Sequence, residues 1–390
     1  MLTPPDPARF ADPVVRDRAR VLAAVLDGAA TARPQLADHL GLRSTAVSHL
    51  VADLLARGLL LEASGPRAGR GRPAATLRAN PAALGASVLS MASRTLSGTL
   101  VDAAGGVLHR VARPVEADAD NAAMARALAG LARQLRRAVP PGMRHAGTSV
   151  AVSGVVDARQ GQWLVSSRWP RLGGLDLPAA LRPTGAPVLV ARQLEAELRA
   201  RLQALPVRDG GTLLVHWGWG IGLAYALDGR TFAADGPFGE IGHWRLEELA
   251  GRRCGCGHTG CLETGAALWS LLPGLRQTWP ALPDDEATLG PQLRQHDLLA
   301  HPPAEAAARL MARTLANLCR LLFPQRLLVC GPLLENEPYR RHFEASFREE
   351  TLLRGLALPP LLHAPADEML AVRGAAAPLL ERAAGDMLEG

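Results

Sequence analysis

Apolar residues recur at intervals of three and four in three short segments near the start of the chain. The segments cover residues 16–26, 34–40 and 44–55. Because this spacing places apolar side chains on one face of a helix, the pattern predicts three amphipathic helices. A glycine follows each of them, as expected where a helix ends in a left-handed turn. Two helices joined by a tight glycine turn are typical of a helix-turn-helix, and we expect Ser44 to cap its second member.

Two segments after the third helix have the composition of short strands. They cover residues 59–62 and 74–78, and the Gly- and Arg-rich residues 65–73 lie between them. Two strands that flank such a loop predict a wing, so the start of the chain is predicted to form a winged helix-turn-helix.

The pattern changes after Asn80-Pro81, the predicted boundary between a domain of residues 1–80 and a domain of residues 81–390. Predicted strands cover residues 87–91, 98–102, 148–153, 187–190, 212–217 and 326–330. Predicted helices cover residues 121–138, 193–205, 304–322 and 372–388. Mixed strands and helices of this kind predict an α/β fold.

Net positive charge is concentrated in the predicted domain of residues 1–80. The chain has 390 residues and a net charge of +6, and all its basic residues are arginines. Residues 43–80 contain six arginines against Asp53 and Glu62, so they supply +4 of that charge. Positive charge beside a helix-turn-helix indicates a nucleic-acid partner, here a double-stranded DNA operator. No apolar run is long enough for a membrane span or a signal peptide, so we expect a cytoplasmic protein without a membrane partner.

The start of the last helix in a helix-turn-helix faces the major groove, which makes its exposed side chains candidate base readers. These candidates are Arg43, Ser44, Thr45, Ser48 and His49. The wing adds Arg67, Arg70 and Arg72, and the run Arg70-Gly-Arg-Pro suits a narrow A·T-rich minor groove. One alternative is a flexible basic linker that touches only phosphates. Another is a helical packing module that binds no nucleic acid.

Three of the five cysteines lie in one glycine-rich loop, downstream of a histidine. The four residues are His243, Cys254, Cys256 and Cys261. One imidazole and three thiolates complete the closed tetrahedral shell that Zn²⁺ adopts in structural sites. Such a shell leaves no position for an activated water, so the zinc is predicted to shape the loop. The alternatives are reduced surface thiols, or His258 as the nitrogen ligand. Cys319 and Cys330 are predicted to be buried core residues.

This region resembles the ROK family, which groups bacterial repressors with sugar kinases. The match is Glu-x-Gly-His followed by Cys-x-Cys-Gly-x-x-Gly-Cys-x-Glu within residues 236–263, with supporting matches at residues 71–73, 153–157 and 218–222. The resemblance implies a two-lobed, actin-like (ribonuclease H-like) ATPase fold behind the winged helix-turn-helix, with the C-terminal helix returning to the first lobe. It also implies a homodimer or tetramer that binds a sugar or sugar derivative.

By the same resemblance, sugar hydroxyls would face Glu240, His243 and Glu263. The kinases carry Glu-Asn-Asp where this chain has Ala191-Arg192-Gln193, and glutamine cannot serve as the general base. The chain also has Ser90-Met91-Ala92 in place of an Asp-x-Gly phosphate loop, and Trp219 in the second phosphate loop. These departures affect one reaction and predict that kinase activity is lost.

The sequence therefore predicts a transcriptional regulator, in most cases a repressor, that is modulated by a sugar-like ligand. Arg192 would favour an anionic ligand if it reached the cleft, and otherwise would point to solvent or pair with Glu195. The other hypotheses are an active sugar kinase, and a regulator whose second domain only oligomerises.

Overall fold

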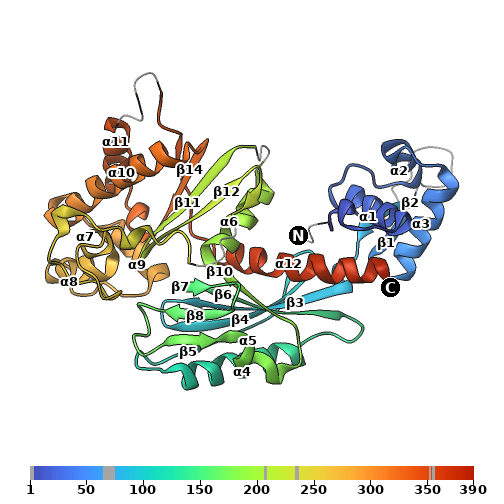
Figure 1. The fold of residues 1–390 in the computed structure, drawn as a ribbon, viewed down its shortest axis with the longest axis horizontal. Helices are drawn as coiled ribbons and strands as arrows, with labels where there is room; N and C mark the ends of the chain where they lie inside the picture. The colour runs from blue at the N-terminus through green and yellow to red at the C-terminus, as the bar shows by residue number, and fades with distance from the viewer. Residues whose placement is uncertain (1–3, 65–74, 206–208, 233–236, 351–352, 354–355) are drawn as a thin grey trace.

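The computed structural model describes residues 4–64, 75–205, 209–232, 237–350, 353 and 356–390. Arg67, Arg70 and Arg72 of the predicted wing lie outside these residues. The chain forms an N-terminal unit (the described residues up to 79), lobe I (residues 81–192 with the last helix) and lobe II (the described residues of 193–363), as Figure 1 shows.

The N-terminal unit contains the three helices and two strands that the sequence predicts. They are α1 Pro13–Leu26, α2 Arg33–Leu40, α3 Ser44–Ala56, β1 Leu60–Ser64 and β2 Ala75–Ala79. Gly41 has φ of 65° between α2 and α3, in the left-handed region that permits the tight turn. The prediction that Ser44 caps α3 is wrong. Arg43 occupies the cap position without a side-chain hydrogen bond, and the Ser44 carbonyl accepts a bond from the Ser48 hydroxyl (2.8 Å).

Lobe I is built on a five-stranded sheet with the order β10-β6-β3-β4-β5. Its strands are β3 Leu84–Ala92, β4 Thr95–Asp102, β5 Val107–Pro114, β6 Arg144–Val152 and β10 Val188–Arg192. Alternate side chains of β3 serve two cores, because Ala86 and Val88 belong to one cluster and Leu89 and Met91 to another. A three-stranded sheet, β7 Val155–Asp157, β8 Gln162–Val165 and β9 Gly173–Asp176, and helices α4 Asn121–Arg137 and α5 Leu177–Leu181 complete the lobe.

Lobe II repeats the same sheet topology in the order β13-β12-β11-β14-β15. Its strands are β11 Gly211–Trp217, β12 Ile221–Leu227, β13 Arg230–Thr231, β14 Arg326–Cys330 and β15 Leu361–His363. In each lobe, the first three strands in chain order pair in the antiparallel direction. The fourth strand then pairs in parallel with the first, and the fifth in parallel with the fourth. The helices are α6 Gln193–Ala204, α7 Glu263–Ala266, α8 Leu268–Thr278, α9 Glu286–Leu293, α10 Pro302–Leu322 and α11 Glu337–Glu349. Cys319 and Cys330 are buried in lobe II, as predicted.

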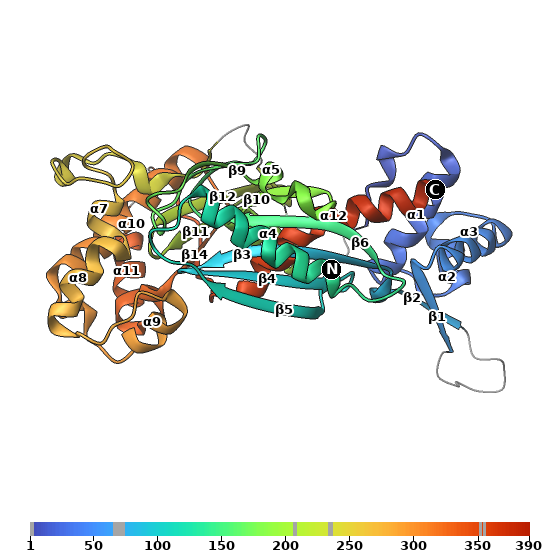
Figure 2. The same ribbon diagram turned by 90° about the horizontal axis from the view of Figure 1, so that it is seen from below.

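The last helix, α12 Glu368–Glu389, connects lobe I to the N-terminal unit. It packs on β3, β6 and α6, and its C-terminal end lies beside α1 (Figures 1 and 2). Gly374 allows the close crossing with α6, because a Cβ there would lie 1.7 Å from the Ala196 carbonyl oxygen. None of the helices in the described ranges, α12 included, is both long and apolar enough to span a bilayer.

Two arginines of the N-terminal unit bind the free carbonyls at the end of α12. The Arg57 guanidinium donates to the Met387 carbonyl (2.8 Å), and that of Arg18 donates to the Leu388 carbonyl (2.6 Å). Asp53 lies between the two guanidinium groups and pairs with both. Cations are favoured at a helix C-terminus, where carbonyls lack intrahelical partners. One continuous core also joins the N-terminal unit, α12 and lobe I, and it includes Leu22, Leu54, Val88 and Leu388. The N-terminal unit is therefore docked on the last helix.

A half-buried histidine in lobe I makes stability dependent on pH. The His145 Nε2 lies 2.8 Å from the Ser87 hydroxyl, and burial, reinforced by the charge of Arg136, lowers the pKa of His145 to about 4. In the unfolded chain the imidazole becomes protonated near pH 6.5, whereas in the folded protein it stays neutral down to about pH 4. We therefore expect the free energy of unfolding to fall as the pH drops from about 6.5 to about 4, by up to about 3 kcal/mol.

Urea unfolding across this pH range provides the measurement. The variant His145→Gln removes the titrating group and should show a flatter profile, whereas His109→Gln, at an exposed position of β5, should retain the slope. An identical slope in the wild type and His145→Gln would contradict the assignment.

Candidate functional site

One histidine and three cysteines converge in lobe II. They are His243, Cys254, Cys256 and Cys261, and their ligand atoms lie within 4.8 Å of one another. The His243 Nδ1 lies 3.6 Å from the Cys254 Sγ, and the Cys256 Sγ lies 3.6 Å from the Cys261 Sγ. Ligand atoms at zinc bond lengths around a tetrahedral ion are about 3.3–3.8 Å apart. The cluster therefore has the composition and dimensions that fit a zinc ion.

The same loop distinguishes between the two candidate nitrogen ligands. His243 ends the 3-10 turn Ile241–His243 and directs Nδ1 toward the sulfurs. His258 is exposed and lies outside the cluster, and it meets Cys254 through its backbone carbonyl (2.9 Å). The geometry thus favours His243.

Glu263 connects the metal loop to the glycine loop of residues 218–222. Its side chain is buried, with one carboxylate oxygen accepting from the Ile221 N–H (2.9 Å) and the other from the Trp269 indole (3.1 Å). Gly242 permits this approach, because a Cβ there would lie 2.6 Å from the Glu263 Oε1. Both oxygens already have partners within the fold, so Glu263 holds two loops together whether or not a ligand also contacts it.

Arg192 ends β10 of lobe I and reaches across to lobe II. Its guanidinium lies 3.6 Å from the Glu240 carboxylate and 3.5 Å from the Leu223 carbonyl, and it is buried over the Phe238 ring. Burial raises the pKa of Glu240 to about 7, although Arg192 opposes the shift. Arg192 therefore neither points to solvent nor forms its ion pair with Glu195, which instead pairs with Arg199 (2.6 Å).

Gln193 follows Arg192 at the first position of α6. Its side-chain Oε1 is buried and has no hydrogen-bond partner among the residues that the structure describes. A buried acceptor without a donor is costly, so this oxygen is available for a donor such as a ligand hydroxyl. Ser90-Met91-Ala92 forms the end of β3, with the Met91 side chain buried.

A second set of charged residues surrounds Trp219, the bulky residue of the glycine loop. The Glu286 carboxylate accepts the Trp219 backbone N–H (2.8 Å) and lies 3.0 Å from the His216 Nε2 and 3.7 Å from the Arg168 guanidinium. Arg168 also stacks over the Trp219 ring, 3.7 Å from its centroid. Only Trp219 was singled out from the sequence. Residues 168, 216 and 286 follow no local spacing that could have grouped them.

The pKa shifts of this cluster indicate an ion pair. Burial alone would lower the pKa of His216, but Glu286 outweighs it and raises that pKa well above the ordinary value. Burial alone would raise the pKa of Glu286, but His216, the Trp219 N–H and Arg168 together hold it below the ordinary value. Imidazolium and carboxylate are therefore the favoured states at neutral pH.

The start of α3 presents the polar side chains that the sequence predicted for base contact. Those of Arg43, Ser44, Thr45, Ser48 and His49 are all exposed. The opposite face of α3 is buried through Val47, Leu50, Val51 and Leu54. The helix thus offers one polar face to a partner and fixes the other in the unit's core.

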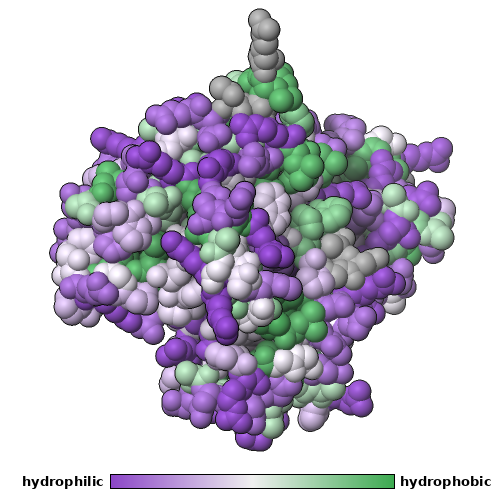
Figure 3. Space-filling model, turned by 60° about the vertical axis from the view of Figure 1, so that its left-hand side comes forward, coloured by the Kyte–Doolittle hydropathy of each residue, from purple (hydrophilic) through white to green (hydrophobic). Residues whose placement is uncertain are grey.

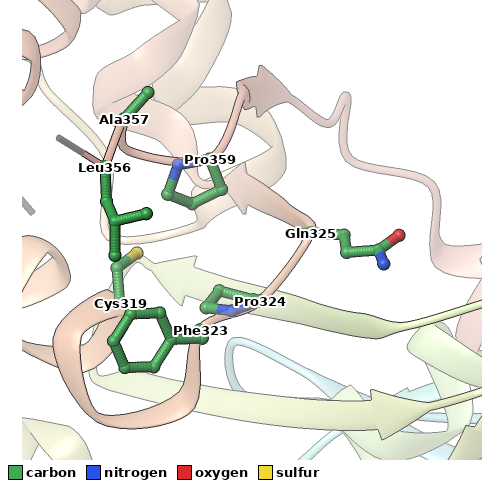
Figure 4. A pocket seen from close by; sticks show the side chains of 7 residues that line it. All are labelled: Cys319, Phe323, Pro324, Gln325, Leu356, Ala357 and Pro359. Atoms are coloured by element: carbon green, nitrogen blue, oxygen red, sulfur yellow. The ribbon is translucent and has the colours of Figure 1, made fainter.

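An apolar pocket of about 320 Å³ lies on lobe II, away from these groups. It is lined by Cys319, Phe323, Pro324, Gln325, Leu356, Ala357 and Pro359, and the Gln325 amide points away from the others (Figure 4). Several large apolar side chains near it are exposed, and Figure 3 shows apolar patches on the side of the molecule formed by lobe II. A pocket without convergent polar groups does not suit a sugar.

Comparison with known proteins agrees with this architecture. The profile of the ROK family matches residues 89–382. NagC, a DNA-binding transcriptional dual regulator of Escherichia coli (strain K12), is 35% identical over 136 residues, which cover 33% of this chain and 33% of NagC. The chain thus matches only a third of that relative's length.

Two solved structures share the fold. One, described as a ROK family transcriptional regulator and homolog of the E. coli MLC protein, has a TM-score of 0.74 at 21% identity and covers 97% of this chain and 99% of its own. The ROK hexokinase of Thermus thermophilus has a TM-score of 0.57 at 26% identity and covers 75% of this chain and 97% of its own. These likenesses confirm the predicted two-lobed, actin-like α/β fold. With three quarters of its length matched by the family profile, the chain belongs to the ROK family.

Proposed function

We propose that this protein is a DNA-binding transcriptional regulator, acting as a repressor, without kinase activity. The exposed polar start of α3 is the observation that carries the proposal, and we assign the N-terminal unit as the winged helix-turn-helix predicted for residues 1–80. The coverage of the two solved structures supports it. The hexokinase is matched almost completely by 75% of this chain, whereas the regulator covers 97% of it. The quarter of this chain that the hexokinase does not match therefore has a counterpart in the regulator and none in the kinase.

Binding to fragments of the parent genome tests the proposal. Removing one specific base contact costs about 1–3 kcal/mol, so His49→Ala should weaken binding to a fragment selected by the wild-type protein by about 5- to 150-fold. Arg43 is a candidate base reader whose charge also attracts the phosphates, so Arg43→Ala should in addition weaken binding to all sequences and lower the salt dependence. Arg341→Ala removes an exposed arginine of α11, far along the chain from α3, and should leave the affinity unchanged. Fluorescence anisotropy at several salt concentrations measures all three, and wild-type protein that ignores DNA at low salt would refute the proposal.

The lack of kinase activity rests on Gln193 at the position of the general base. An amide can accept a hydrogen bond from a hydroxyl but cannot take up its proton. A coupled ATPase assay with a panel of sugars should therefore give no sugar-dependent turnover. ATP consumption that depends on a sugar would identify an enzyme instead.

The effector that we propose is a neutral sugar or sugar derivative bound between the lobes. The unpartnered Gln193 Oε1 can accept a bond from a hydroxyl, and the Arg192 guanidinium already lies 3.6 Å from the Glu240 carboxylate. An anionic ligand would have to displace that carboxylate. Calorimetric titration should therefore detect neutral sugars and not their phosphorylated forms. Protein whose melting temperature responds to no carbohydrate would point to a regulator whose ROK domain only oligomerises.

Zn²⁺ bound by His243 and the three cysteines is proposed to hold the metal loop in place. Bound there, the ion would supply a fixed tetrahedral junction and no reactive water. The chain's own residues then orient the neighbouring groups, since His243 retains its second ring nitrogen for a ligand.

We also propose that the protein binds its operator as a homodimer or tetramer, which sedimentation analysis would establish.

A further inference from the structure

Glu286 stands at the junction of the two lobes. It is the first residue of α9 in lobe II, and its backbone N–H donates to the Ser93 hydroxyl between β3 and β4 of lobe I (3.4 Å). Arg168 of lobe I approaches the Glu286 carboxylate and donates to the Asp284 carbonyl (3.0 Å), while Arg94 lies 3.9 Å from the Asp284 carboxylate. Residues 284–286 therefore receive contacts from two separate loops of the opposite lobe.

The groups around the Glu286 carboxylate are those of an oxyanion site. A backbone N–H (Trp219), an imidazole (His216) and a guanidinium (Arg168) converge on its two oxygens. Such donors bind small carboxylates and phosphates through charge-assisted hydrogen bonds. Arg168 is buried, so solvent does not satisfy its charge.

The backbone is shaped around this carboxylate. A Cβ at position 218 would lie 2.3 Å from the Glu286 Oε2 and 2.2 Å from the His216 Nε2, so only glycine leaves room for the contact. Trp219 closes the site by stacking beneath the Arg168 guanidinium. A surface ion pair formed by chance would not require a glycine on one side and an aromatic ring on the other.

We propose that Arg168, His216 and the Trp219 backbone form an oxyanion-binding site that the chain fills with its own Glu286 carboxylate, which fastens lobe II to lobe I. The site takes small oxyanions, carboxylate or phosphate, and the internal carboxylate excludes free ones. The position of the lobes then depends on an internal ligand in addition to any effector. The proposal does not depend on DNA binding, and its test uses neither DNA nor sugar.

Removing the internal ligand should create a vacancy that a free anion can occupy. Glu286→Ala should lower the melting temperature by about 5 °C or more. Sodium acetate or sodium phosphate should restore part of this loss, beyond sodium chloride at equal ionic strength, because each would bind only the folded state. The acetate and phosphate arms separate the two anion classes. Small-angle X-ray scattering should show a larger radius of gyration for Glu286→Ala, which the restoring anion reduces.

Three variants make the result interpretable. Glu286→Gln preserves the shape and leaves no vacancy, so it should be destabilised without anion rescue. Glu337→Ala removes an exposed carboxylate that pairs with Arg341 on α11, and it should show neither effect. Glu286→Ser repeats the rescue test if the alanine variant does not fold. The proposal would be overturned if acetate and phosphate raised the melting temperature of Glu286→Ala or Glu286→Ser no more than that of Glu286→Gln and Glu337→Ala.

Discussion

Cys256→Ala should abolish zinc binding and lower the free energy of unfolding by about 3–5 kcal/mol or more. Structural zinc sites contribute their binding energy to folding, and three ligands cannot close the tetrahedral shell. The loop also carries Glu240 and Glu263, which contact Arg192 and the glycine loop. We therefore expect the variant to lose the proposed response to sugar together with the proposed zinc ion. Zinc analysis of purified protein and thermal unfolding measure the two effects.

His258→Ala is the matched control for this experiment. The residue lies in the same loop but is exposed and outside the cluster. It should retain one zinc ion and the wild-type melting temperature. If His258→Ala lost zinc and His243→Ala retained it, His258 would be the nitrogen ligand. If wild-type protein freed of zinc kept its melting temperature, the ion would have no structural role.

Leu388→Asp should detach the N-terminal unit from the rest of the molecule. Leu388 is fully buried in the core shared by α12 and the N-terminal unit, and a buried unpaired carboxylate costs several kcal/mol. The unit would then unfold in a separate transition that calorimetry resolves. A dimer with undocked units loses the geometry for simultaneous half-site binding, so operator affinity should fall by about ten-fold to a hundred-fold.

Glu389→Ala provides the comparison, because the neighbouring side chain is exposed. It should leave a single transition and normal affinity. If Leu388→Asp also melted in one transition and bound DNA like the wild type, the docking on α12 would have no role in binding.

Sequence patterns predicted most central elements and missed those without local signals. The strand β14 matches its prediction at both ends, because a run of apolar residues marks a buried strand. The edge strand β5 was missed since nearly all its side chains are exposed, which removes the alternation. α8 and α9 were missed as well, and each contains an internal proline, which sequence rules treat as a helix breaker.

The residues of the candidate site also fall into those that are close in the sequence, which could be predicted, and those that meet only in the folded protein. The metal cluster could be predicted because its cysteines share one short loop, so their spacing alone carries the signal. The Glu286 cluster could not, since Arg168, His216 and Glu286 meet only after both lobes have folded. The pairing of Arg192 with Glu240 also depends on the contact between the lobes, and the sequence suggested Glu195 because it is near in the chain.

The docking of the N-terminal unit on α12 imposes an order on synthesis. α3 ends at Ala56, whereas α12 begins at Glu368, so α3 leaves the ribosome long before the helix on which the N-terminal unit rests is synthesised. The carbonyls that Arg18 and Arg57 bind belong to Met387 and Leu388, which have not yet been synthesised when the N-terminal unit emerges from the ribosome. A nascent chain thus cannot hold the exposed polar face of α3 in its final orientation until α12 has left the ribosome.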